Sequence, residues 1–197
     1  MAGFVPPAVE AVMAELEAID RRDRVDGTPK SKRLRAISPD VGRFLMTLAL
    51  GVGARTILEV GTSGGYSTLW LAVAARHRRG RVVTFEVDPA KVDIACRAID
   101  RAGLGETVEV RLGDGGAGLA DFEATADLVF LDAEKEDYER FLEPAVRALR
   151  PGGILVADNI LSHPAELAGF REAALGHPAL TGLVVPIGRG ELVAVKL

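Results

Sequence analysis

The sequence has little of what marks secreted, membrane-spanning or nucleic-acid-binding proteins. Its single cysteine, Cys96, excludes an internal disulfide and a cysteine-based metal cluster. Basic charge is not in excess, because 24 Lys and Arg stand against 28 Asp and Glu, for a net charge of −4. Nucleic-acid-binding domains usually carry a basic face or a pI above about 9. The longest apolar stretch, residues 44–54, lies between Arg43 and Arg55 and is shorter than the ~18 residues of a membrane span.

The first residues also lack the basic start and apolar run of a secretory signal, and contain Pro6, Pro7 and Glu10 instead. We therefore expect a cytoplasmic protein. Hydrophobic residues make up 48% and charged residues 26% of the chain, which is ordinary for a globular protein. At 197 residues the length predicts a single domain over residues 1–197, since domains usually run to about 100–200 residues.

Strand patterns alternate with helix patterns along most of the chain. Short apolar runs predict strands over residues 56–60, 81–86, 107–112, 128–131, 154–157, 181–186 and 192–196. Helical periodicity and capping residues predict helices over residues 7–22, from Ser38, over 64–75, from Asp88 to Gly103, from Lys135 and over 165–175. This order predicts an α/β fold with a doubly wound, mostly parallel sheet, helices on both faces and an antiparallel C-terminal strand. Ligands of such sheets bind outside the carboxyl ends of the strands.

Glycine is abundant, with 22 residues, and several follow the first of these strands. Residues 61–65 read Gly-Thr-Ser-Gly-Gly, and glycines let a backbone turn sharply and approach a ligand closely. Ser63 stands where the dinucleotide fingerprint G-x-G-x-x-G has its second glycine, which disfavours a pyrophosphate ligand. A plain tight turn between strand and helix is the alternative interpretation.

Glu86 ends the next strand, some 20 residues beyond the glycine-rich turn. A carboxylate in this place suits hydrogen bonding to the ribose diol of a nucleoside cofactor, and several cofactor classes are bound this way. A solvated strand end is the simpler interpretation of Glu86 taken alone.

Two further strand ends carry oxygen ligands and a lysine. Asp132 and Lys135 follow the strand that ends at residue 131, and Asp158 and Asn159 follow the strand that ends at residue 157. Two carboxylates and an amide oxygen favour Mg²⁺, Ca²⁺ or Mn²⁺ over zinc. A lysine beside a divalent cation holds its proton less tightly, which suits a general base. Taken singly, these residues also fit a helix cap, a solvated side chain and a turn, but their joint occurrence at adjacent strand ends favours the cation site.

Four segments together resemble the cation-dependent O-methyltransferases, the group that contains the catechol and caffeoyl-CoA O-methyltransferases and many small bacterial members. They are ILEVGTSGGYSTLWLA (57–72), VVTFEVDP (82–89), LVFLDAEKEDYERFL (128–142) and LRPGGILVADNIL (149–161). The LDAEKEDY segment with the Asp158–Asn159 pair is more specific than the glycine loop, which all class I methyltransferases share. The resemblance covers residues 37–196 and implies the Rossmann-like class I methyltransferase fold.

The resemblance also implies a role for each matching residue. Asp132, Asp158 and Asn159 match the ligands of Mg²⁺ or a similar cation (Mn²⁺ or Ca²⁺), and Lys135 matches the lysine that takes the proton from the substrate hydroxyl. The residues that match the S-adenosylmethionine site are Ile37, Glu59, Gly61, Ser63, Ser67, Glu86, Asp114 and Asp132. Among these, Glu86 corresponds to the acid on the ribose, Ile37 to a residue whose backbone holds the cofactor carboxylate, and Asp114 to a position near the adenine.

The activity implied is methyl transfer from S-adenosylmethionine to one hydroxyl of a catechol-like or vicinal-diol small molecule. We further expect a homodimer, with an N-terminal helix and mobile lid over residues 1–36 and the catalytic core over 37–197. After Asn159 the chain passes almost directly into a helix, where larger relatives have an insertion that shapes the substrate pocket. The short connection argues against an acyl-CoA acceptor and for a more open site.

Several interpretations stay open at this point. His163 either caps the next helix or lines the pocket, and the basic residues between Lys30 and Arg35 are either solvated or meet an anionic substrate group across the cleft. The alternative functions are a nicotinamide-dependent oxidoreductase on a related fold, which Ser63 disfavours, and a non-catalytic protein that binds S-adenosylmethionine.

Overall fold

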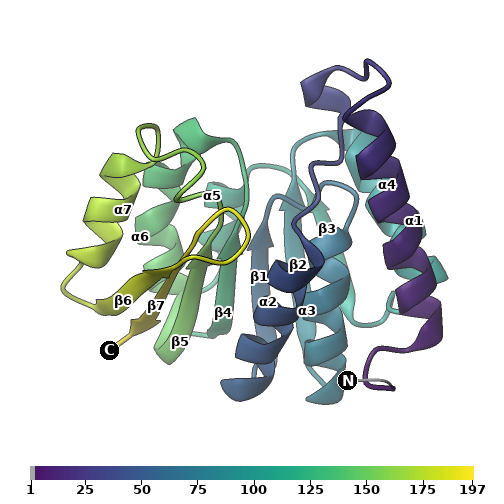
Figure 1. Cartoon of the computed structure of the whole chain (residues 1–197). Coiled ribbons are helices and arrows are strands. Elements are labelled where there is room, and N and C mark those ends of the chain that lie inside the picture. The colour runs from purple at the N-terminus through teal and green to yellow at the C-terminus, as the bar shows by residue number, and fades with distance from the viewer. Residues whose placement is uncertain (1–2) are drawn as a thin grey trace.

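Seven strands form one sheet at the centre of the computed structural model, which describes residues 3–197 (Figure 1). The strands are β1 (Thr56–Val60), β2 (Arg81–Glu86), β3 (Val108–Leu112), β4 (Ala126–Leu131), β5 (Leu149–Ala157), β6 (Leu180–Val185) and β7 (Glu191–Lys196). Their order is β3-β2-β1-β4-β5-β7-β6. Strands β1 to β5 pair in parallel, and β7 pairs antiparallel with β5 and β6. The expected α/β fold with a mostly parallel sheet and an antiparallel C-terminal strand is confirmed.

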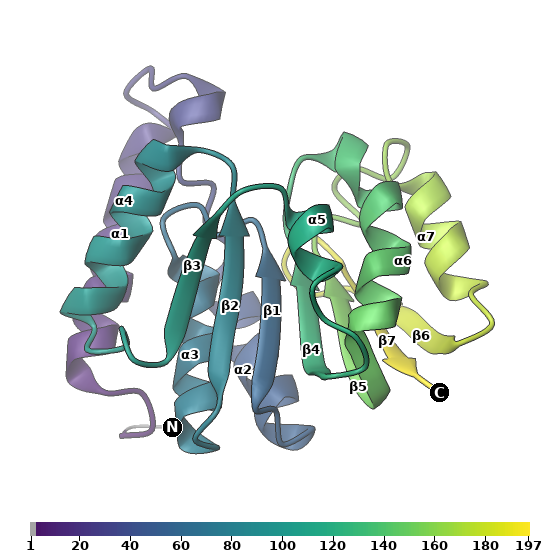
Figure 2. The same ribbon diagram turned by 180° about the vertical axis from the view of Figure 1, so that it is seen from behind.

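Helices cover both faces of the sheet, as expected. One face packs against α1 (Pro7–Asp23), α2 (Pro39–Gly51), α3 (Tyr66–His77) and α4 (Pro89–Arg101). The other packs against α5 (Gly115–Leu119), α6 (Tyr138–Ala148) and α7 (Ala168–Leu175). Figure 1 shows α2 and α3 in front of the strands, and Figure 2, from behind, shows α5 and α6 in front of them. Each face has its own apolar core, so the strands between them are buried on both sides.

The helix starts follow from local sequence. Pro39 and Pro89 occupy first turns, where a missing N–H costs nothing, and the preceding Ser38 and Asp88 accept hydrogen bonds from backbone amides of the same turn. Helix α3 is apolar on nearly every side because the sheet covers one flank and α2 the other, which leaves residues 66–75 buried.

Three local expectations are corrected by the structure. The strand predicted over residues 154–157 begins earlier, at Leu149 of β5, because Leu149 already pairs with Ala126 ahead of a register shift. The predicted helix from residue 64 starts at Tyr66, because Gly65 takes a left-handed conformation with φ of +87°. The helix expected from Lys135 begins as a short 3₁₀ turn over Lys135–Asp137 and becomes α-helical at Tyr138.

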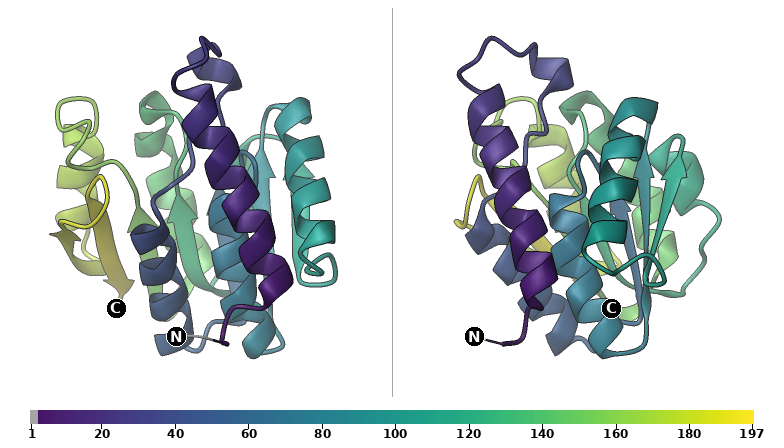
Figure 3. Two further views of the ribbon diagram at one scale, coloured as in Figure 1. Left: turned by 45° about the vertical axis from the view of Figure 1, so that its right-hand side comes forward. Right: turned by 90° about the vertical axis from the view of Figure 1, so that its right-hand side faces the viewer.

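The sheet order reverses beside β1, which places a ligand crevice at that point. The chain runs outward from β1 to β2 and β3, and then returns to β4 on the other side of β1. The segment between α1 and α2 arches beyond the carboxyl ends of the strands, and α1 lies across α3 and α4 (Figure 3). Among residues 3–197 no helix has both the length and the apolar character to cross a membrane.

Candidate active site

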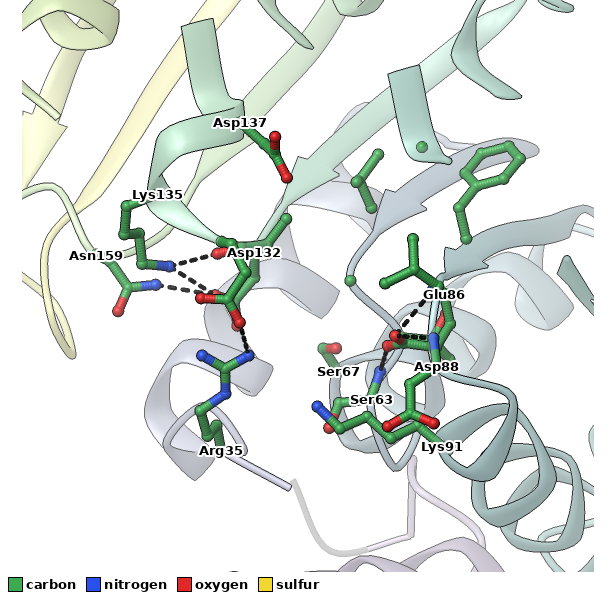
Figure 4. Close-up of a pocket in the computed structure, with 18 of the residues that line it drawn as sticks. Arg35, Ser63, Ser67, Glu86, Asp88, Lys91, Asp132, Lys135, Asp137 and Asn159 are labelled. Atoms are coloured by element: carbon green, nitrogen blue, oxygen red, sulfur yellow. Dashed lines mark hydrogen bonds and ion pairs between the residues drawn. The ribbon is translucent and has the colours of Figure 1, made fainter. Parts of the chain in front are cut away.

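A cavity of about 660 Å³ lies at the carboxyl ends of the strands. Its walls come from the loops that follow β1 to β5 and from the segment that links α1 to α2. Nine of the eleven predicted site residues line the cavity, and only Glu59 and Asp158 do not. The nine are Ile37, Gly61, Ser63, Ser67, Glu86, Asp114, Asp132, Lys135 and Asn159. Figure 4 shows Ser63, Ser67 and Glu86 on one side of the cavity, and Asp132, Lys135 and Asn159 on the other.

The loop after β1 brings its backbone close to the end of β4. Gly61 has φ of +101°, and a Cβ there would lie 2.0 Å from the carbonyl oxygen of Asp132. Ser63 also has positive φ, at +47°, and its hydroxyl donates to the carbonyl of Leu34 at 2.5 Å. Only glycine fits at position 61, and Ser63 ties the loop to the segment that covers it.

The carboxylate of Glu86 is held by backbone amides. It accepts hydrogen bonds from the N–H groups of Ser63 at 2.7 Å, Val87 at 2.9 Å and Asp88 at 3.0 Å. Three amide donors fix the orientation of this carboxylate at the cavity wall. The free lone pairs of this carboxylate suit the two hydroxyls of a ribose.

Glu59 lies behind the cavity wall. It is fully buried, absent from the lining, and accepts from the hydroxyls of Ser67 (2.5 Å), Thr68 (2.5 Å) and Thr84 (2.7 Å). Burial raises the pKa of Glu59 from 4.5 to about 7 against these hydrogen bonds. Glu59 therefore does not itself line the cavity; it holds the hydroxyl of Ser67, which does.

Ile37 and Asp114 lie at two other places in the wall. Ile37 is buried within it. Asp114 caps α5 by accepting from the amide of Ala117 at 2.8 Å, and its other oxygen accepts from Arg140 at 2.6 Å. The Arg140 guanidinium holds the pKa of Asp114 below its usual range.

On the opposite side, Asp132 and Asn159 are in contact. Asn159 Nδ2 donates to Asp132 Oδ1 at 2.9 Å. Burial, followed by repulsion from Asp158, raises the pKa of Asp132 to about 6. The Asn159 amide and the Asp132 carboxylate thus form one polar cluster, and Asp158 adds a second negative charge next to it.

Lys135 points into the same cluster. Its Nζ donates to the carbonyl of Ala133 at 2.8 Å, lies 3.5 Å from Asp132 Oδ1 and 5.0 Å from the centre of the Tyr138 ring. The side chain is only 15% exposed, so the amine is held at the cavity rather than solvated.

Asp158, the third expected ligand, is buried next to this group but does not line the large cavity. It borders a second cavity of about 420 Å³, and its Oδ1 accepts from the backbone N–H of Asn159 at 2.5 Å. The structure brings Asp132, Asp158 and Asn159 together, with two of them on the large cavity and one beneath it.

Sequence reasoning missed Glu191, the first residue of β7. The side chain is fully buried, and among residues 3–197 neither carboxyl oxygen has a hydrogen-bond partner. Burial, followed by repulsion from Asp158, raises the pKa of Glu191 to about 10. No local signal marks this residue, because its burial results from the pairing of β7 with β5.

Two residues of the basic segment, Lys30 and Arg35, and also His163 line the cavity. Arg35 forms an ion pair with Glu134 across the cavity mouth, and Lys30 contributes to the lining while Lys32 is exposed outside it. His163 also lines the cavity, and α7 begins only at Ala168. Of the two interpretations of His163, the pocket position is the one observed.

The donor set at this end fits a hard divalent cation. The partly buried Asp132 and the buried Asp158 repel one another, and Lys135 and Arg35 are the cations that offset the charge of Asp132. Carboxylate and amide oxygens are the ligands that Mg²⁺, Mn²⁺ and Ca²⁺ prefer. In residues 3–197 no three His, Cys, Asp or Glu side chains converge as they stand around one metal position.

Comparisons with known proteins identify the family. Residues 12–169 match the O-methyltransferase family. The chain is similar to the catechol O-methyltransferase of Niastella koreensis, with 40% identity over 136 residues, and to that of Mycobacterium tuberculosis, with 41% identity over 127 residues. Each alignment covers 64% of this chain. It covers only 58% of the Niastella enzyme and 57% of the Mycobacterium enzyme. It is also similar to a crystal structure of an O-methyltransferase from Bacillus cereus in complex with SAH, with 30% identity, a TM-score of 0.79 and coverage of 95% of this chain and 91% of that one.

Proposed function

Because this chain belongs to the O-methyltransferase family, we propose that it transfers the methyl group of S-adenosylmethionine to a hydroxyl of a catechol-like or vicinal-diol small molecule, assisted by a divalent cation. One observation carries the proposal. A single cavity is lined on one side by the glycine loop and Glu86, and on the other by Asp132, Lys135 and Asn159. A methyl donor and a hydroxyl acceptor held on these two sides would face each other across the cavity.

The first side suits S-adenosylmethionine. The fixed carboxylate of Glu86 would accept from the ribose hydroxyls, and the close turn at Gly61 leaves room for the methionine part beside Ser63 and Ser67. Asp114 and Ile37 would border the adenine and the carboxylate end. The Bacillus cereus relative supports this assignment, because SAH is the form that the cofactor takes after losing its methyl group.

The second side suits the acceptor. Asp132, Asp158 and Asn159 would hold the cation, with the Asn159 amide turned so that its oxygen faces the ion. A bound divalent cation lowers the pKa of a hydroxyl coordinated to it. Lys135, as the neutral amine, would then accept the hydroxyl proton at Nζ. The acceptor oxygen forms the new C–O bond as the methyl–sulfur bond breaks, and the electron pair of that bond stays on sulfur.

The acceptor class follows from the size of the site and the short chain beyond Asn159. Only residues 160–167 separate Asn159 from α7, and His163 and Glu166 of that connection line the cavity. We infer a small acceptor with two neighbouring hydroxyls. The homodimer and the cytoplasmic location also belong to the proposal; light scattering during size-exclusion chromatography tests the dimer.

The decisive experiment incubates the purified protein with S-adenosylmethionine, Mg²⁺ and a panel of catechols, and detects the methylated product and SAH by mass spectrometry. We expect turnover with at least one catechol and its loss after EDTA, restored by excess Mg²⁺. Calorimetry with S-adenosylmethionine and with NAD and NADP compares the cofactors. Cofactor binding without any turnover would indicate a non-catalytic protein, and preferential NAD binding an oxidoreductase. Turnover that persists in EDTA would exclude the cation from the proposal.

A further inference from the structure

The carboxyl group of Glu191 is buried without a hydrogen-bond partner in the described part of the chain, and the proposed function does not account for it. The side chain is 0% exposed, and among residues 3–197 no donor reaches either of its oxygens. A buried polar group left without a partner destabilises the fold, and a charged one does so more. Native structures keep very few such groups, and one beside a ligand cavity requires a binding or structural explanation.

Its position in the sheet points to the ligand cluster. Ala157 of β5 pairs with Leu192 of β7 in antiparallel register, which puts Glu191 opposite Asp158 at the end of the ladder. The alternation of β7 confirms the side: Leu192 packs in the core that contains α6, whereas Val193 packs against the opposite core. Glu191 shares the face of Val193, on which the carboxyl group of Asp158 also lies, because Val156 belongs to that same core.

The chain immediately before Glu191 fixes this strand end. The carbonyl of Gly190 accepts from Ile160 N at 2.9 Å, and the carbonyl of Arg189 accepts from Leu161 N at 3.0 Å and Ser162 N at 3.1 Å. These bonds tie the loop before β7 to the residues that follow Asn159. The backbone at the start of β7 is therefore fixed next to the residues that follow Asn159.

Among residues 3–197 no lysine or arginine side chain forms a hydrogen bond with Glu191. The charged groups that act on it are the carboxylates of Asp158 and Asp132, which repel it, and the more distant Lys135. The ammonium of Lys135 is already directed at Ala133 O and Asp132. Three acidic side chains thus lie at and behind one wall of the cavity, with Lys135 and Arg35 acting on Asp132. A divalent cation would neutralise the charge that the protein leaves unpaired.

We propose that Glu191 supplies a third carboxylate to the divalent cation site formed by Asp132, Asp158 and Asn159. The inference rests on the proposed function, because it takes the cation site as given. The described residues hold no ready-made trio of acidic groups around one point, so binding would require the three carboxylates to move together. The ion would favour that movement by neutralising their mutual repulsion. The cation accordingly binds more tightly than two carboxylates and one amide alone allow.

The test is calorimetric titration of the EDTA-treated, dialysed protein with MnCl₂ and with MgCl₂. Glu191→Gln keeps the shape of the side chain but cannot ionise to bind a cation, so we expect affinity for both ions to fall by about 10–100-fold. Glu172→Gln, on the exposed side of α7, is the matched control and should bind as the wild type does. Thermal unfolding without metal verifies folding, and E191Q should melt at the same or a higher temperature because it removes a buried unpaired acid.

The outcomes separate this inference from the proposed function through a third variant, Asp132→Asn. Weaker binding in E191Q together with little or no binding in D132N supports both. Wild-type affinity in E191Q with binding lost in D132N overturns the role of Glu191 and leaves the cation site of the proposed function intact. Absence of Mn²⁺ and Mg²⁺ binding by the folded wild-type protein overturns both.

Discussion

At the scale of single residues, Lys135 carries the proton transfer in the proposed reaction. Its amine donates to Ala133 O at 2.8 Å and lies 3.5 Å from Asp132 Oδ1, so it is fixed on the side of the cavity that we assign to the acceptor. Other site residues are also positioned by a hydrogen bond to a neighbour. Asn159 donates to Asp132 on one side of the cavity, and the backbone N–H of Ser63 donates to Glu86 on the other.

Replacing Lys135 by alanine should lower kcat by about 10²–10⁴-fold, the usual contribution of a general base. The affinity for S-adenosylmethionine should be unchanged, because Lys135 lies on the acceptor side (Figure 4). Steady-state kinetics measure kcat, and calorimetry measures cofactor affinity. The remaining rate of K135A should rise with pH, as hydroxide takes over the role of the amine.

Lys32→Ala is the matched control for this variant, since Lys32 is exposed and outside the cavity lining. It should keep wild-type kcat. Full activity in K135A would show that the acceptor loses its proton without help from Lys135, and a parallel loss of cofactor affinity would indicate that the variant disturbs the site as a whole.

At the scale of elements, the turn between β1 and α3 depends on one glycine. Gly61 has φ of +101°, and a Cβ would meet the carbonyl of Asp132 at 2.0 Å. Gly61→Ala should therefore reduce the free energy of unfolding by at least about 1–3 kcal/mol, the usual cost of overpacking, and should weaken cofactor binding, because the turn must move away from β4. Urea denaturation and calorimetry measure the two effects.

Gly51, the last residue of α2, provides the opposite case. Nothing lies within 4 Å of a Cβ built on it, and its φ is not in the left-handed region. Gly51→Ala should stabilise the protein by up to about 1 kcal/mol through helix propensity. If G61A were as stable as G51A, the close approach of the β1 turn to Asp132 would not be a constraint on the native fold.

Most elements could be predicted because their signals are local. The strands at 56–60 and 81–86 are apolar runs bounded by turns, and Ser38 and Asp88 are capping residues before prolines. Helix α5 (Gly115–Leu119) was missed because its sequence GGAGL indicates a turn, and only the Asp114 cap marked it. Here tertiary packing overrides propensity, since Gly118 fits against the ring of Phe85 where a Cβ would not.

The candidate site also contains residues that local sequence signals reveal and residues that they do not. Residues that end predicted strands, such as Glu86 and Asp132, were identified because strand ends of a parallel sheet share one edge. Glu191 and the Arg35–Glu134 ion pair were missed because they depend on contacts between distant segments. The indirect place of Glu59 was also beyond sequence reasoning, because the side-chain alternation of β1 puts it under the helix α3 rather than in the cavity.

At the scale of the whole molecule, acidic side chains are buried together at one end of the sheet. Glu59, Asp132, Asp158 and Glu191 are all buried or nearly so near the carboxyl ends of the strands. The modest net charge of −4 conceals this local concentration. Ligand binding should therefore be strongly coupled to stability, because a cation offsets charges whose burial the unliganded fold tolerates at a cost.

The pH dependence of stability should reveal one of these acids separately. The pKa of Glu59 rises from 4.5 to about 7 in the folded protein because of burial, so between these two pH values the folded state holds a proton that the unfolded state has released. Stability from this group is therefore fully present below about pH 4.5 and is lost as the pH rises to about 7, with a total of about 3 kcal/mol from the shift.

Glu59→Gln removes this titration and keeps a side chain of the same shape for Ser67, Thr68 and Thr84. Urea unfolding of the metal-free wild type and of E59Q at intervals from pH 5 to 8 measures the difference in free energy of unfolding. We expect the wild type to lose stability relative to E59Q as the pH rises to about 7, and the difference to stay constant above that pH. Glu172 is an exposed acid, so the control variant Glu172→Gln should follow the wild type at every pH. Parallel curves for wild type and E59Q would mean that the three hydroxyl donors keep Glu59 ionised in the fold, which would make it a fixed negative charge beneath the cofactor site rather than a titrating group.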